Sequence, residues 1–201
     1  MDDGELLRAW ARGEREAGRA LFERYYEAVS RFFCNKVREP GDLVQRTFLG
    51  CMEAADRYAG QSNFRSFLFG IAINVLRKYY RDNGGDRFVD ADAQPSVEAL
   101  GQSPSAVLAV RDEQRLLLAA LRRLPVDLQL ILELHYWEQS KVSEIAELME
   151  LPEGTIKSKM RRGRQLVEAA LGDLASSPAL LESTLGGLDR WAAELRGSLG
   201  A

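Results

Sequence analysis

A chain of 201 residues, 46% of them hydrophobic, is long enough for one or two domains with cores of their own, which excludes wholesale disorder. Its formal net charge of −3 excludes a uniformly basic nucleic-acid-binding protein but leaves room for a local basic surface. Two isolated cysteines and a single histidine exclude a zinc-binding pattern and a disulfide framework, and no apolar run is long enough to span a membrane.

The amino-terminal sequence MDDGELLRAWARGE is acidic and amphipathic and lacks the apolar core of a signal peptide. Cys34 and Cys51 are expected to be small buried hydrophobic residues in a reducing compartment. We therefore expect a cytoplasmic protein without membrane insertion and without a bound metal.

The first predicted element is helical from Gly4 to Val37, where aliphatic and aromatic residues recur at the spacing of a buried helix face. Gly13 and Gly18 are its expected weak points. Residues 39–41 break the pattern, and Asp42 is placed to cap the helix that follows.

Residues 42–58 form the next predicted helix, and residues 59–63 separate it from a helix over residues 64–82. Aromatic and basic residues alternate in this last helix. Exposed rings would offer stacking surfaces to single-stranded nucleic acid, and the basic residues would follow its backbone. Taken alone, the residues favour the simpler alternative of a packed helix with a charged rim.

Residues 84–106 are rich in Gly, Pro, Ser, Asp and Ala without a sustained period, which predicts a flexible linker. Helical pattern resumes over residues 107–124 and, after Pro125, over residues 126–139. His135 is the single histidine of the chain and belongs to no nucleophile or metal-ligand pattern, so a structural role is favoured. The chain shows no phosphate-binding loop, nucleophile pattern or metal-ligand set, and therefore gives no positive case for an enzyme or a cofactor.

Residues 142–171 predict two amphipathic helices joined by a tight turn at residues 150–152. Pro152 suits the opening of the second helix, because an early helical position has no backbone hydrogen bond to lose. Basic residues cover the second helix outside its apolar side. This is the plan of a helix-turn-helix motif, whose second helix enters the major groove of DNA. The alternative is a helical hairpin with a solvated charged face.

Two stretches, residues 42–82 and 121–171, together resemble regions two and four of bacterial sigma factors of the extracytoplasmic-function type, the small members of the sigma-70 family. The resemblance implies an all-α fold of two helical domains joined by a flexible linker. It implies a transcription initiation factor without catalysis that binds core RNA polymerase, directs it to promoters and assists melting of the minus-ten element. The implied partners are core polymerase, duplex and melted promoter DNA and, where one exists, an anti-sigma factor.

The implied domain boundaries are 4–83 for region two, 84–106 for the linker, and 107–172 for region four. Residues 173–201 form a C-terminal extension that the family plan does not explain, with apolar residues at helical spacing. We expect either a helix packed back on the C-terminal domain or a segment that clamps the domains, binds a regulator or covers the basic helix.

The resemblance also implies three sets of binding residues. The polymerase-binding set lies on a D-x-x-Q-x-x-F helix and comprises Asp42, Leu43, Val44, Gln45 and Phe48. The set that opens the minus-ten element and captures a flipped base comprises Tyr58, Asn63, Asn74, Arg77 and Lys78. The set that reads the minus-thirty-five element comprises Gly154, Thr155, Lys157, Ser158, Arg161 and Arg162.

Three departures from the family pattern bear on these sets, and one is Arg161, which stands where a bulky or aromatic residue is often found, so that promoter preference is expected to differ. Arg46 stands where the family usually has an acid, which reverses a charge on the polymerase-facing helix. Lys141 stands where a capping Ser or Thr is expected ahead of Glu144, so that Ser140 becomes the candidate cap. Two other functions stay open: a stand-alone helix-turn-helix regulator that binds two half-sites as a dimer, and a helical adaptor without a nucleic-acid role.

Overall fold

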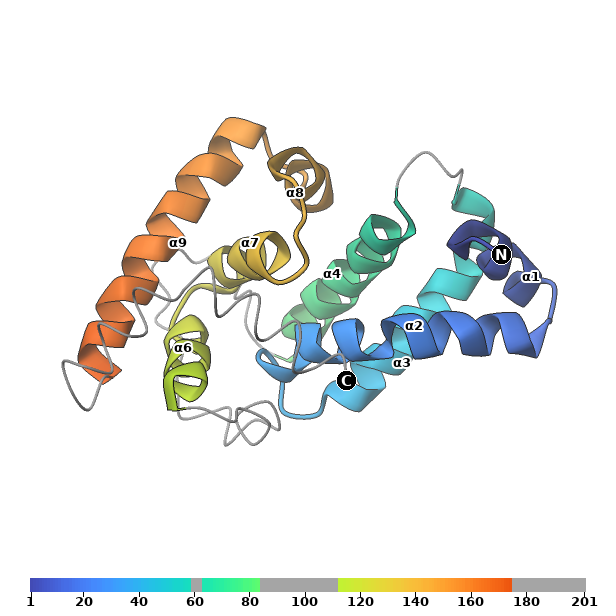
Figure 1. Cartoon of the computed structure of the whole chain (residues 1–201), viewed down its shortest axis with the longest axis horizontal. Coiled ribbons are helices and arrows are strands. Elements are labelled where there is room, and N and C mark those ends of the chain that lie inside the picture. The colour runs from blue at the N-terminus through green and yellow to red at the C-terminus, as the bar shows by residue number, and fades with distance from the viewer. Residues whose placement is uncertain (59–62, 84–111, 175–201) are drawn as a thin grey trace. The chain divides into compact units, whose positions relative to one another are not determined.

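The computed structural model describes residues 1–58, 63–83 and 112–174 (Figure 1). These residues form eight α-helices and one 3-10 helix and contain no strand, which confirms the predicted all-α class. The predicted linker and all but the first two residues of the predicted C-terminal extension lie outside the described residues. The chain divides into two compact units, Met1–Phe33 with Glu39–Gly85, and Cys34–Arg38 with Asp86–Ala201.

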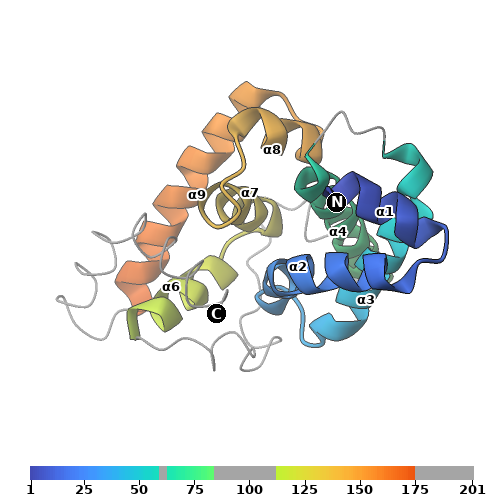
Figure 2. The same ribbon diagram turned by 45° about the vertical axis from the view of Figure 1, so that its right-hand side comes forward.

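The first unit is a helical bundle with an aromatic core. Its elements are α1 (Asp3–Ala11), α2 (Arg15–Cys34), α3 (Pro40–Glu53), the 3-10 helix η1 (Ala55–Arg57) and α4 (Phe64–Asp82). Helix α3 packs along α4 (Figure 1, Figure 2). The two helices approach closely at Gly50, where an added Cβ would lie 3.1 Å from Cγ2 of Ile71.

Three local predictions for this unit need correction. The helix predicted from Gly4 to Val37 is two helices, and Gly13 separates them with a φ of 97°, a value that glycine adopts without strain. Gly18 is not a weak point but lies inside α2, because the indole of Trp10 occupies the space of its missing side chain. Asp42 is not a cap, since α3 begins at Pro40 and Asp42 lies in its first turn.

The buried face of α4 differs by about one helical stripe from the predicted one. The buried residues are Phe64, Leu68, Phe69, Ala72, Ile73, Leu76 and Tyr80. Helical spacing in the sequence predicts that Phe64, Phe67, Leu68, Ile71, Val75 and Tyr79 pack inward. Phe64 and Leu68 do so, whereas the other four are only half-buried. They border the core and lie closer to the exposed side of the helix.

The second unit consists, in its described part, of residues Cys34–Arg38 and of α6 (Asp112–Arg122), α7 (Val126–Tyr136), α8 (Val142–Met149) and α9 (Glu153–Leu174). Helices α6, α7 and α8 all pack on the long helix α9 (Figure 1, Figure 2). Gly163 of α9 allows this approach, since an added Cβ would lie 3.1 Å from Cδ1 of Leu132 on α7. A mid-helix glycine costs about 1 kcal/mol relative to alanine, and close packing explains why it is tolerated here.

A buried ion pair lies within the second unit. The ammonium group of Lys36 donates to the carboxylate of Glu133, and both side chains are almost wholly removed from solvent. Gln129 donates from Nε2 to the other carboxylate oxygen of Glu133 at 2.8 Å. Burial lowers the pKa of Lys36, and the charge of Glu133 opposes that shift. Neither charge is buried without a partner, as the cost of desolvating an ion requires.

Gly18→Ala is expected to lower the free energy of unfolding by about 1–3 kcal/mol, because the new methyl group overlaps the indole of Trp10. Gly41→Ala is the matched control, since no atom lies within 4 Å of its Cβ position. Urea unfolding of both variants gives the measurement. An unfolding midpoint of Gly18→Ala equal to that of Gly41→Ala would contradict the packing described.

Cys51 is expected to resist thiol reagents while the protein is folded. Its side chain is buried, and burial raises the pKa of the thiol to about 12, so that little thiolate forms at pH 8. In a Cys34→Ser variant, Cys51 is the single remaining thiol. Labelling at pH 8 should be slow in buffer and complete in denaturant, whereas equal rates would show that the thiol is accessible.

Candidate functional site

Helix α3 divides the predicted polymerase-binding residues between two faces. Asp42 and Gln45 are exposed, whereas Leu43, Val44 and Phe48 are between 2% and 4% exposed. The ring of Phe48 packs 4.9 Å from that of Phe22 on α2. A partner can therefore reach the first two side chains directly, and the other three hold the helix on the core.

An ion pair modifies the exposed face of α3. Nη2 of Arg46 lies 2.7 Å from Oδ2 of Asp42, one helical turn away, and both side chains are more than half exposed. The charge reversal at Arg46 is thus compensated locally by the acid that begins the motif. Exposed pairs of this kind contribute little to stability, so their charges remain open to exchange for those of a partner.

Three large apolar side chains beside this face were not among the predicted residues. Phe22 and Tyr26 of α2 and Leu49 of α3 are each between 41% and 44% exposed. The ring centroids of Phe22 and Tyr26 lie 4.8 Å apart. Neighbouring exposed apolar side chains mark interaction surfaces. Helical spacing alone could not have identified them, because it assigns both aromatic residues to the core.

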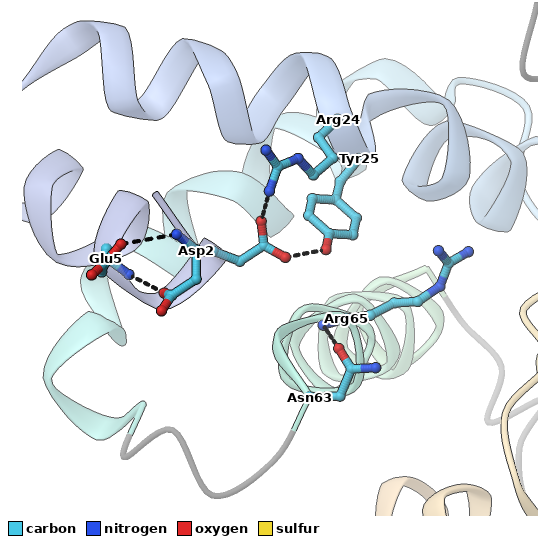
Figure 3. A network of polar contacts seen from close by, with 7 residues as sticks. Asp2, Glu5, Arg24, Tyr25, Asn63 and Arg65 are labelled. Atoms are coloured by element: carbon cyan, nitrogen blue, oxygen red, sulfur yellow. Dashed lines mark hydrogen bonds and ion pairs between the residues drawn. The ribbon is translucent and has the colours of Figure 1, made fainter.

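The predicted minus-ten residues of α4 share one side of that helix. Asn74 follows Asn63 by eleven positions, close to three turns, and Arg77 and Lys78 follow Asn74 by one turn. Asn63 also caps α4, since its Oδ1 accepts from the backbone N–H of Arg65 at 3.1 Å (Figure 3). Nη1 of Arg77 lies 3.5 Å from Oδ1 of Asn74. The side thus carries amides and cations in one row.

Tyr58 ends η1 and packs on the first turn of α4. Its ring centroid lies 5.8 Å from that of Phe64 and 5.1 Å from that of Phe67. Partial burial, with the charges of Asp2 and Asp3, raises the pKa of its hydroxyl, which stays protonated at neutral pH. Tyr58 and Asn63 flank residues 59–62, which lie outside the described residues.

The start of α8, the helix that precedes α9, differs from the prediction. Helix α8 begins at Val142 with Lys141 as its N-cap, so Ser140 is not the cap. The backbone N–H of Lys141 donates to Oε2 of Glu144 at 2.7 Å, which preserves the carboxylate half of a capping box. Glu150 ends α8 in the left-handed conformation with a φ of 59°.

Helix α9 buries one side and exposes the predicted minus-thirty-five residues on the other. The predicted apolar side is confirmed, and its buried residues include Ile156, Met160, Gly163, Val167 and Leu171. The exposed predicted residues are Gly154, Lys157, Ser158, Arg161 and Arg162, and Thr155 is half-buried. They recur at intervals of three and four positions, so they form one continuous surface.

Two basic residues of α9 contact the second unit itself. Nζ of Lys159 lies 2.5 Å from Oδ2 of Asp127, and the guanidinium carbon of Arg164 lies 5.5 Å from the ring centroid of Tyr136. Lys157 makes a longer contact of 3.8 Å with Glu153 in the next turn. The exposed basic residues of this side are therefore Lys157, Arg161, Arg162 and Arg164, and the guanidinium of Arg164 is directed at Tyr136.

The remaining candidate groups have structural surroundings. The ring of His135 packs 5.0 Å from that of Tyr136, and its Nδ1 lies 3.3 Å from the carbonyl oxygen of Ser140. Over residues 1–58, 63–83 and 112–174, no group of three or more His, Cys, Asp or Glu could hold a metal ion. In the same ranges, no helix is both long enough and apolar enough to cross a membrane.

Known proteins match the chain in both units. The family described as "Sigma-70 region 2" matches residues 21–85, and "Sigma-70, region 4" matches residues 114–167. The "ECF RNA polymerase sigma-E factor" of Escherichia coli and that of Salmonella typhimurium are each 25% identical to this chain over 178 residues, covering 84% of it and 93% of the relative. The factor of Haemophilus influenzae is 24% identical, with 94% of its length covered.

A solved structure has a similar fold. CnrH, in complex with the cytosolic domain of CnrY, aligns with a TM-score of 0.60 and 22% identity, covering 86% of this chain and 99% of CnrH. At this identity the alignment demonstrates shared architecture alone. Both regions match the same chain, which is far more specific than a lone helix-turn-helix motif.

Proposed function

Since the chain belongs to the sigma-70 family, as an extracytoplasmic-function sigma factor that directs RNA polymerase to promoters, we propose which of its surfaces perform each step. Residues 4–83 bind core polymerase and open the minus-ten element, and residues 107–172 hold the minus-thirty-five element. Sigma factors are not enzymes, and we propose no reaction. Both family matches and the relatives named are sigma factors, so the alternative of a stand-alone dimeric regulator is unsupported.

The polymerase surface that we propose is the exposed face of α3 with the adjoining edge of α2. Asp42 and Gln45 supply its polar contacts, and Phe22, Tyr26 and Leu49 supply apolar area. This combination of a few apolar anchors within a polar rim is typical of protein interfaces. Three further members of the predicted set, Leu43, Val44 and Phe48, support the surface from beneath.

The minus-ten surface is the side of α4 that begins at Tyr58 and Asn63. Extruding a base costs a few kcal/mol, which stacking and hydrogen bonds to the extruded base can offset. An aromatic ring and an amide at this end suit those two contacts. Asn74, Arg77 and Lys78 continue along the same side and suit the phosphates of the melted strand.

The minus-thirty-five surface is the outward side of α9, and its geometry is the observation that carries the proposal. A buried apolar side fixes the helix, and Lys157, Arg161 and Arg162 project from the opposite side. Gly154 and Thr155 in the first turn suit a phosphate at the positive end of the helix dipole. Ser158 lies between them and the arginines.

We extend the proposal to the setting in which the chain acts. It works in the cytoplasm, where core polymerase is found. CnrH was solved bound to a protein domain, which supports a protein regulator of the anti-sigma class for this chain. Co-purification of a protein that competes with core polymerase for the chain would test this extension.

The double variant Gln45→Ala, Leu49→Ala should weaken binding to core polymerase at least tenfold, because truncated interface anchors cost about 1–2 kcal/mol each. Both side chains are exposed, so the thermal unfolding midpoint should stay unchanged. Glu16→Ala, at an exposed position near the start of α2, is the control. Fluorescence titration with core polymerase gives the affinities. Wild-type affinity in the double variant would contradict the proposed surface.

Arg161→Ala and Arg162→Ala should each weaken binding of the reconstituted holoenzyme to minus-thirty-five duplex DNA. Loss of a phosphate contact lowers the slope of log affinity against log salt by about 0.9, and loss of a base contact relaxes specificity at one position. Arg164→Ala is the matched control, because its guanidinium faces Tyr136. Fluorescence anisotropy over a salt series measures all three. An equal loss in Arg164→Ala would show that orientation on α9 does not decide DNA contact.

A further inference from the structure

The amino-terminal helix α1 lies against Tyr58, the aromatic residue of the proposed minus-ten surface. It is a well-defined helix, since Asp2 and Glu5 form a complete capping box. The backbone N–H of Glu5 donates to Oδ1 of Asp2 at 2.8 Å, and that of Asp2 donates to Oε2 of Glu5 at 2.9 Å (Figure 3). Residues 1–20 precede the range matched by the region-two family.

Tyr58 packs directly on the backbone of α1. Gly4 is buried, and an added Cβ there would lie 2.9 Å from Cε1 of Tyr58. Real Cβ contacts are essentially never this short, so with a side chain at position 4 either the ring of Tyr58 or the backbone of α1 must shift. The position of Tyr58 therefore depends on the absence of a side chain at Gly4.

The same helix is tied to the other flank through α2. The hydroxyl of Tyr25 donates to Oδ2 of Asp3 at 2.5 Å, and Arg24 pairs with the other oxygen of that carboxylate. The ring of Tyr25 lies 5.2 Å from that of Phe64, the first residue of α4. Figure 3 shows Tyr25 on α2 and Asn63, the N-cap residue of α4.

Burial and charge strengthen this tie. Tyr25 is buried, and burial together with its bond to Asp3 raises the pKa of its hydroxyl, which remains a donor at every physiological pH. Asp3 is half-buried, and each of its carboxylate oxygens accepts a hydrogen bond from a side chain of α2. Side chains bound in this way have few alternative rotamers, so α1 has a fixed position over the first unit.

We propose that α1 positions the minus-ten site: Gly4 sets the place of Tyr58, and Asp3 sets the place of Phe64 and the Asn63 cap through Tyr25. Gly4, Asp3 and Tyr25 are positioning residues and do not touch DNA themselves. The inference rests on the proposed minus-ten surface. A role confined to stability would affect every binding activity of the first unit, whereas positioning affects capture of the melted strand alone.

The test compares Gly4→Ala and Tyr25→Phe with wild type in holoenzyme reconstituted with core polymerase. Tyr25→Phe keeps the ring on Phe64 and removes only the hydroxyl donor, so it covers the case in which Gly4→Ala fails to fold. Gly172→Ala is the control, because no atom lies within 4 Å of its Cβ position. The probe is a fluorescent single-stranded oligonucleotide that carries the minus-ten sequence selected by wild-type holoenzyme from a random pool.

Both variants should lose about tenfold in affinity for the melted-strand probe, the scale of one disturbed base contact. Affinity for core polymerase, affinity for minus-thirty-five duplex and the thermal midpoint should stay at wild-type values. Wild-type affinity of both variants for the probe would overturn the inference, and so would a parallel loss of polymerase binding. Failure of wild-type holoenzyme to select any minus-ten sequence would instead overturn the proposed minus-ten surface.

Discussion

Burial of one side of each helix decides which residues remain to bind a partner, and the functional surfaces of this chain depend on that constraint. Helix α9 presents its basic side outward because its opposite side is packed against α7, where Gly163 meets Leu132. Helix α3 presents Gln45 because Phe48 is packed against Phe22. Burial of each apolar side chain contributes about 1.5–3 kcal/mol, whereas exposed ion pairs contribute at most about 1 kcal/mol, so packing fixes the surfaces and charge only modifies them.

Charge is distributed so that an acidic chain can still offer a basic surface. The net charge of −3 is an average, and DNA affinity depends on the cations that face the phosphates. On α9, Lys159 is paired with Asp127, and Arg164 is exposed but directed at Tyr136. On α3, Arg46 is paired with Asp42. The structure therefore gives Arg46 a partner of opposite charge on the same helix.

Helical periodicity was enough to predict the individual helices, the helix-turn-helix unit and the buried side of α9, because these are local patterns of 3.6 residues, whereas the all-α class came from the family resemblance. It failed on α4, where apolar residues occupy two adjacent stripes and only packing against other helices selects one. It failed at Gly18 because the partner of that glycine, Trp10, belongs to another helix. The residues predicted to bind polymerase likewise include both exposed and buried side chains, and only packing separates those that a partner can reach from those that hold the helix on the core.

Support for a binding site can also lie outside the segment that a family shares. The region-two match begins at residue 21, yet Gly4 contacts Tyr58 and Asp3 holds Tyr25, and all of these contacts lie within the first unit. In residues 21–85 alone, the ring of Tyr58 would lack its contact with Gly4, and the hydroxyl of Tyr25 would lack the Asp3 carboxylate as its acceptor. A buried donor without a partner costs about 1–3 kcal/mol. The packed unit is therefore set by where side chains find their partners, and here it includes the capping box of α1.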